Sequence, residues 1–327
     1  MRTSSELKTE LARSTPGSLS QRLRFDVEQT LKSLYADESL ADRMDDLFIP
    51  FADWVSERSR PNIGPLILGM SGAQGCGKTT FCTVVSHILR KGFDLNAVVL
   101  SLDDLYLTHS DRMKYSNEVH PLFSVRGVPG THDVVLADTI IQRLKDLKDG
   151  EVMFLPAFDK SMDDRKPVHR WTQVEGPVDV VFFEGWCVGA SEMPKKTLQE
   201  PMNLLEEKND SSAQWRNCVN EHLKHDYRSL FEHIDILLWM QAPNYDVVYD
   251  WRNKQERTLE NHLYDIHGGI LDTLDIKVMS SEELKAFMQH YERLTRFMLS
   301  SMAGRADVVF TLDESQKVVK WDYPIEH

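Results

Sequence analysis

The chain has 327 residues, 41% of them hydrophobic and 27% charged, which is typical of a globular protein and excludes the disordered and fibrous classes. Its formal net charge of −13 argues against nucleic acid or an anionic membrane as a partner, because both attract basic surfaces. The four cysteines lack metal-ligand spacing, the N-terminus lacks a signal-peptide pattern and no apolar run is long enough to span a membrane, so we expect a cytoplasmic protein.

The first 60 residues predict a helical leader packed on the main domain. Residues 1–15 are polar, and apolar residues then recur at helical spacing in two stretches. The first stretch carries Leu19, Leu23, Val27, Leu31 and Leu34, and the second carries Leu47, Phe51, Trp54 and Val55. The main domain is then expected to span residues 61–327.

Five short apolar runs in the main domain predict buried parallel strands. They cover residues 66–70, 97–102, 178–183, 234–240 and 307–312. Helical patterns over residues 79–90 and 134–147 lie between them, and this alternation predicts an α/β fold with a doubly wound parallel sheet.

The first of these runs leads into the strongest motif of the chain. GAQGCGKT, from Gly72 to Thr79, matches G-x-x-x-x-G-K-[ST] and lies between a strand and a helix, as a phosphate-binding loop requires. The glycines let backbone amides surround a phosphate, Lys78 would reach the β- and γ-phosphates, and the Thr79 hydroxyl would ligate Mg²⁺. The motif therefore predicts binding of ATP with Mg²⁺, through Gly72, Ala73, Gln74, Gly75, Cys76, Gly77, Lys78, Thr79 and Thr80.

The second and third strands both end in acidic residues. Asp103 and Asp104 follow the second strand, at the edge of the sheet where such folds bind ligands. One of them could accept the proton of an attacking hydroxyl, with the other solvated or capping a helix; alternatively both cap a helix or turn. Glu184 ends the third strand in VVFFEGW and could ligate Mg²⁺ or polarise the nucleophile; the alternative is a capping or surface glutamate.

Two charged loops between these strands are candidates to hold the molecule that receives the phosphate. They are RGVPGTHD and PAFDKSMDDRKP, and their cations suit a carboxylate. The alternative for each residue is a solvated surface charge. The candidate acceptor contacts are Asp104, Tyr106, Arg126, His132, Asp133, Lys160 and Arg165.

The C-terminal half predicts mostly helices. Residues 194–233 are expected to form a helical insertion, and residues 250–300 a lid with C-terminal helices, one of which has Leu284, Phe287, Met288, Tyr291 and Leu294 on one face. Arg252 in WRNKQE, with Arg257 beyond it, could neutralise charge in a phosphoryl-transfer transition state. The alternative is a pair of exposed arginines bonded to Glu256 and Glu260.

The chain resembles a known family through six motifs that occur in this order: SLDDLYLT, RGVPGTHD, FDKSMDDR, FFEGW, QAPNYDVVYDWRNKQE and ADVVFTLD. Over about residues 60–315 it resembles the D-glycerate 3-kinase family of plants and fungi, and especially its fungal and bacterial kinase-like branch. This family belongs to a wider group of P-loop kinases with phosphoribulokinase, uridine kinase and pantothenate kinase.

The resemblance implies a five-stranded parallel sheet with flanking helices, Mg-ATP as phosphate donor, and D-glycerate as an acceptor at its 3-hydroxyl. It also implies that Asp103 is the base, Glu184 the acid of the third strand, and Arg252 a lid or phosphate contact. The chain has RGVPGTHD where the plant enzymes have a loop resembling RGNAGSHD, and its SMDDRKP stretch is shorter than theirs. Both departures fall in the expected acceptor loops, so the resemblance carries the transfer chemistry further than the substrate.

Two functions therefore follow from the sequence. The favoured one is a small-molecule kinase for an organic acid, with a nucleoside, pantothenate or a sugar phosphate as alternative acceptors. The other is a non-catalytic regulatory protein that uses bound ATP as a switch. Paired aspartates, cationic loops and the candidate lid favour the kinase, and no pattern predicts an oligomeric state.

Overall fold

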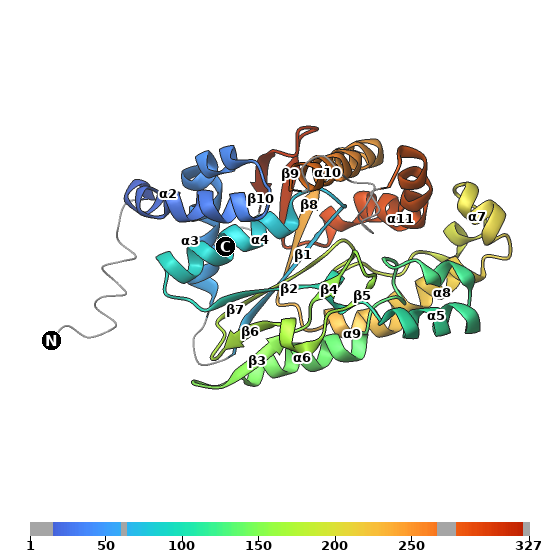
Figure 1. Ribbon diagram of the computed structural model, residues 1–327, viewed down its shortest axis with the longest axis horizontal. Helices are drawn as coiled ribbons and strands as arrows, with labels where there is room; N and C mark the ends of the chain where they lie inside the picture. Colours follow the sequence, from blue (N-terminus) through green and yellow to red (C-terminus); the bar gives the residue numbers. More distant parts are fainter. Residues whose placement is uncertain (1–15, 60–63, 267–278, 323–327) are drawn as a thin grey trace.

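The computed structural model describes residues 16–59, 64–266 and 279–322, and a six-stranded sheet forms its centre (Figure 1). The strand order is β10-β9-β8-β1-β7-β2, and five neighbouring strands run parallel. The strands are β1 Leu66–Gly72, β2 Ala97–Ser101, β7 Val180–Gly185, β8 Ile236–Gln241, β9 Val308–Leu312 and β10 Val318–Asp322. The prediction of an α/β fold around a parallel sheet is confirmed.

The sixth strand is a correction to the predicted five-stranded sheet. β10 pairs antiparallel with β9 at the sheet edge. Only Val318 is buried in its sequence VVKWD, so it offers no apolar run of the kind that marked the other strands. An edge strand keeps one side in solvent and needs no continuous apolar sequence.

The sheet separates two apolar cores because side chains alternate along each strand. In β7, Phe182 contacts one core and Phe183 the other. Figure 1 shows helices on both faces. The first face carries α2 Pro16–Ser33, α3 Ile49–Arg58 and α4 Lys78–Gly92; the second carries α5 His109–Glu118, α6 Val134–Asp146, α8 Gln214–His222 and α9 Arg228–Phe231.

The remaining elements surround the carboxyl ends of the strands or the sheet margin. The helices are α7 Leu204–Asn209, α10 Tyr245–Ile266 and α11 Ser281–Ser301. Two small antiparallel pairs are β3 Val152–Leu155 with β6 Thr172–Glu175, and β4 Phe158–Asp159 with β5 Asp164–Arg165. Residues 267–278 of the expected lid, and the side chains of Glu256 and Glu260, lie outside what the structure describes. In the described ranges no helix combines the length and apolarity that a bilayer crossing needs.

The leader joins the core through an aromatic cluster. Phe51 of α3 is fully buried, and its ring lies 5.3 Å from that of Phe81 and 5.2 Å from that of Phe310, between ring centroids. Trp321 of β10 contacts the same ring at 5.7 Å. Since these partners come from α4, β9 and β10, we propose that the described part of the leader, residues 16–59, unfolds together with the sheet.

Replacing Phe51 with Ala is expected to lower the free energy of unfolding by about 3–5 kcal/mol, because the cluster cannot close around the missing ring. Chemical denaturation measures the loss. Phe25→Ala is the control, because Phe25 is 68% exposed and its loss should cost less than about 0.5 kcal/mol. A loss of unfolding free energy in Phe51→Ala as small as that in Phe25→Ala would show that the leader does not stabilise the sheet.

Candidate active site

The glycine-rich loop connects β1 to α4 at the carboxyl edge of the sheet. Gly75 and Gly77 have φ angles of +76° and +94°, a region that favours glycine, and Gly77 is the N-cap of α4. A Cβ on Gly72 would lie 2.8 Å from Cys76 Sγ and 2.9 Å from Met240 Cβ, so this position has no room for a side chain. The sequence thus forms the tight turn into a helix N-terminus that binds phosphate in other proteins.

Lys78 lies within this loop. Its Nζ donates a hydrogen bond to the Ala73 carbonyl at 3.1 Å, and only 9% of the residue is exposed. Of the other predicted nucleotide contacts, Ala73 and Cys76 are buried and Thr80 is half-buried. Both amide atoms of Gln74 are buried and have no hydrogen-bond partner among the described residues. The lysine ammonium is therefore held inside the glycine-rich loop.

Two segments that are distant in the sequence contact the glycine-rich loop. The side-chain amide of Gln316, which follows β9, donates to the Gly75 carbonyl at 2.5 Å. A Cβ on Gly75 would lie 3.1 Å from Trp251 Cβ in α10, and Trp251 itself donates to the Glu314 carbonyl at 2.8 Å. The glycine at position 75 is thus needed for contact with α10 as well as for its φ angle.

Thr79 and Glu184 form an oxygen-rich pair at the start of α4. The Thr79 hydroxyl donates to Glu184 Oε1 at 3.0 Å, and Glu184, at the end of β7, is 3% exposed. The alternative of a surface glutamate is therefore wrong. A hydroxyl and a carboxylate fit Mg²⁺, which usually takes one or two protein oxygens and completes its shell with water and substrate phosphates.

Asp103 lies in the short turn after β2, residues Leu102–Leu105, where the Ser101 hydroxyl accepts the Asp103 amide. Its carboxylate accepts hydrogen bonds from the Tyr106 hydroxyl at 3.0 Å and from Lys160 Nζ at 2.7 Å. Burial on its own would raise the pKa of Asp103, but the charge and hydrogen bond of Lys160 and the hydrogen bond from Tyr106 together outweigh it and hold this pKa well below its usual range. Asp103 is thus an ionised carboxylate at the carboxyl edge of the sheet.

Asp104 departs from the expectation that the second aspartate is solvated or caps a helix. Its Oδ1 accepts the backbone amide of Phe158 at 2.9 Å, which ties the turn after β2 to β4. Burial raises the pKa of Asp104. The two neighbouring carboxylates therefore differ, one paired with an ammonium and one holding a backbone amide.

Four other predicted acceptor contacts pair mainly with each other. The Tyr106 ring stacks on His132 with centroids 4.4 Å apart, and Arg165 donates to both the Tyr106 carbonyl and Asp133 at 2.9 Å. Asp133 also caps α6. Burial lowers the pKa of His132 to about 3, so this ring is neutral, and its Nδ1 lies 2.5 Å from the Tyr227 hydroxyl. The alternative of solvated surface charges is wrong for Asp133 and Arg165.

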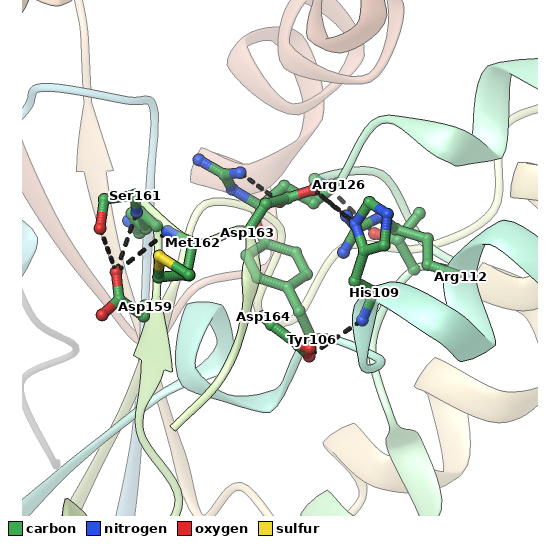
Figure 2. A network of polar contacts seen from close by, with 12 residues as sticks. Tyr106, His109, Arg112, Arg126, Asp159, Ser161, Met162, Asp163 and Asp164 are labelled. Atoms are coloured by element: carbon green, nitrogen blue, oxygen red, sulfur yellow. Dashed lines mark hydrogen bonds and ion pairs between the residues drawn. The ribbon is translucent and has the colours of Figure 1, made fainter. Parts of the chain in front are cut away.

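Arg126 lies beside the β4–β5 hairpin, residues 158–165, together with an arginine that the sequence did not reveal. Figure 2 shows Arg112 of α5 and Arg126 bonded to the same carboxylate, that of Asp163. Arg112 lies in the polar sequence HSDRMKYSNE, which looks like a solvent-exposed helix, yet its side chain is completely buried. No local pattern distinguishes it, because the acceptors of its hydrogen bonds, the Ser124 carbonyl and the Asp163 carboxylate, lie outside the helix.

Tyr291 of α11 connects the parts of the site. Its hydroxyl donates to the Arg126 carbonyl at 2.9 Å. Burial raises the pKa of Tyr291, the charge of Asp103 raises it further, and the charges of Arg126 and Arg252 oppose the rise. Arg252 of α10 is half-buried, whereas Arg257 further along the same helix is exposed.

These features, a phosphate loop on the first strand and carboxylates at the ends of its neighbours, define a P-loop kinase. No family model matches the chain. It is 31% identical over 260 residues to an uncharacterized kinase of Schizosaccharomyces pombe, mug58, covering 77% of this chain and 87% of that protein. It is also 30% identical over 239 residues to chloroplastic D-glycerate 3-kinase of Arabidopsis thaliana, covering 70% of this chain and 47%, about half, of that protein.

A solved structure gives the same result. D-glycerate 3-kinase from Cryptococcus neoformans superposes with a TM-score of 0.67 at 26% identity, over 85% of this chain and 99% of the other. The chain belongs to the family of P-loop kinases that contains the D-glycerate 3-kinases and these fungal kinases.

Proposed function

We propose that the protein transfers the γ-phosphate of ATP, with Mg²⁺, to a hydroxyl of a small organic acid, with D-glycerate and its 3-hydroxyl as the leading acceptor. The observation that carries this proposal is Asp103, an ionised carboxylate beside Lys160 at the edge of the sheet where the phosphate loop lies. The names of the plant and Cryptococcus relatives support glycerate as the acceptor. On the grounds of charge and composition, we further propose a cytoplasmic enzyme that acts without nucleic acid or membrane.

In the proposed reaction, the Asp103 carboxylate takes the proton of the acceptor hydroxyl as its oxygen bonds to the γ-phosphorus. The bond from that phosphorus to the β–γ bridging oxygen breaks, and ADP leaves with the bond's electrons. Lys78 and Arg252 stabilise negative charge on the phosphates. Mg²⁺, held by Thr79 and Glu184, supplies further neutralisation of that charge when bound.

We propose that Lys160 controls the pH range over which Asp103 is ionised and can act as a base. Its ammonium stabilises the ionised carboxylate, and we propose that the acceptor hydroxyl displaces it from the Asp103 oxygen. The charge of Asp103 in turn raises the pKa of Lys160, so the pair persists across neutral pH. We propose that Lys160 then contacts the acceptor.

Lys160→Met is expected to move the acid limb of kcat/KM for the acceptor to higher pH, by about 1 to 3 units. With Lys160 gone, its charge and hydrogen bond no longer oppose burial and the pKa of Asp103 rises, so protonation removes the base at a higher pH than in the unmodified enzyme. Rate profiles between pH 4 and 8 measure the shift. Lys160→Arg keeps the charge and should keep the limb of the unmodified enzyme; a shift of equal size in this control would disprove the electrostatic explanation.

A coupled assay of ADP release tests the proposed function. The acceptors compared are D-glycerate, other hydroxy acids, pantothenate, ribulose 5-phosphate and nucleosides, each with Mg-ATP. We expect D-glycerate to raise turnover well above the rate without acceptor. Tight ATP binding with slow hydrolysis that no acceptor accelerates would instead favour the regulatory protein.

A further inference from the structure

Two arginines share one carboxylate beside the proposed acceptor site. Asp163 accepts hydrogen bonds from Arg112 Nη2 and Arg126 Nη1, and His109 Nδ1 lies 3.3 Å from it (Figure 2). Arg112 Nε also donates to the Ser124 carbonyl at 3.0 Å, but Nη1 is buried and has no partner among the residues that the structure describes. A buried guanidinium donor without an acceptor is costly, so this cluster has capacity for a further anionic oxygen.

The proposed acceptor site has two ends, one at Asp103 and one at Arg112 and Arg126. The β4–β5 hairpin pairs with each end through a residue of opposite charge. Its Lys160 pairs with the Asp103 carboxylate, and its Asp163 pairs with the two arginines. Between them Met162 is 75% exposed and the Lys160 side chain 61% exposed, so the tip lies in solvent, whereas Asp163 is half-buried. Asp163 has a φ of +52°, and Asp159 accepts the amides of Ser161 and Met162, which closes the tip.

The two ends of the site are separated by one pair of aromatic rings. The Arg126 guanidinium lies 5.8 Å from the centroid of the Phe158 ring, which packs edge-on against Tyr106 at 5.3 Å. The Tyr106 hydroxyl in turn donates to Asp103. The Phe158–Tyr106 ring pair therefore connects the Arg126 end of the site to the Asp103 end.

We propose that Arg112 and Arg126 form the binding site for the carboxylate of the acceptor, and that Asp163 occupies this site until the acceptor displaces it. This inference rests on the proposed function and names the groups that select its substrate class. A short hydroxy acid offers a hydroxyl for Asp103 and a carboxylate for the arginines, matching the Lys160 and Asp163 contacts at both ends. A neutral polyol lacks the group that could replace Asp163.

The test compares Arg126→Gln and Asp163→Asn by steady-state kinetics with D-glycerate and by calorimetric titration of D-glycerate into the enzyme. Arg126→Gln should raise KM and Kd by roughly 10- to 100-fold, with a much smaller change in kcat, because a charge-assisted pair is lost. Asp163→Asn should lower both constants by roughly 3- to 10-fold, because the internal competitor is weakened. Asparagine tolerates the positive φ at this position.

Asp159→Asn is the matched control for the hairpin, because it alters the tip without touching the arginines. If Asp163 were only structural, its substitution would raise KM, as a loosened tip would in Asp159→Asn. A rise in KM in both variants would overturn the proposal while leaving the kinase intact. Arg126→Gln is preferred because replacing the completely buried Arg112 carries a greater risk of preventing folding.

Glycerol and ribulose 5-phosphate are the comparison ligands. A glycerol KM that rises with Arg126→Gln as much as that of D-glycerate would overturn the carboxylate assignment, and so would arginine-dependent binding of the sugar phosphate alone. If D-glycerate binds through Arg126 but is not phosphorylated, the site stands and the proposed reaction fails. If D-glycerate neither binds nor reacts, both are wrong.

Discussion

Asp103→Asn is expected to lower D-glycerate-dependent ADP release by about 10²- to 10⁴-fold, the usual contribution of a general base. The amide keeps the size of the side chain and can still accept a hydrogen bond from Tyr106, but it cannot take the hydroxyl proton. ATP binding should change little, because no predicted nucleotide contact includes Asp103. Coupled assays for turnover and a fluorescent nucleotide titration for binding measure the two effects.

Asp104→Asn is the matched control for this prediction. Its amide oxygen can still accept the Phe158 amide, so the turn after β2 should remain tied to β4. We expect turnover to fall far less than in Asp103→Asn. An equal loss in both variants would assign the effect to disruption of the turn and would remove Asp103 as the base.

Lys78→Met should lower kcat/KM for ATP by about 10²- to 10³-fold, the cost of removing one positioned group that stabilises transition-state charge. The alkyl stem still fills its buried site, whereas the donor to the Ala73 carbonyl and the charge near the phosphates are lost. Initial rates across ATP concentrations measure the effect.

Lys91→Met serves as its control, because Lys91 lies exposed in the last turn of the same helix. It removes the same charge from α4 and should leave kcat/KM within about twofold of the unmodified enzyme. A comparable loss in this variant would mean that net charge, and not the position of Lys78, controls ATP use.

The parts of the fold that the sequence predicts are those with a local cause. Five strands are apolar runs because both faces of a parallel sheet are covered, and the phosphate loop is a contiguous motif. β10 escapes prediction because Val318 is the one buried residue of its five, so the strand has no apolar run. The sequence places Asp103 and Glu184 each at the carboxyl end of a strand, whereas their proximity comes from the pairing of β2 with β7, which sets Ser101 opposite Glu184.

The acceptor side depends on contacts between distant segments, which a sequence pattern does not contain. Arg112 lies in a polar helix, yet it is buried and bonds to residues 124 and 163, which lie outside that helix. Arg165 and Asp133 look like free loop charges but bond to each other. Lys160 is a tip residue whose partner, Asp103, is 57 positions away. These pairings decide which charges remain for a substrate.

The most direct test of the central claim is to identify the product formed from D-glycerate and Mg-ATP by ³¹P nuclear magnetic resonance, alongside a count of ADP. We predict a phosphate monoester on the 3-hydroxyl of glycerate, formed in equal amount with ADP and absent in Asp103→Asn. ADP accompanied only by inorganic phosphate, at a rate that Asp103→Asn does not change, would contradict the account.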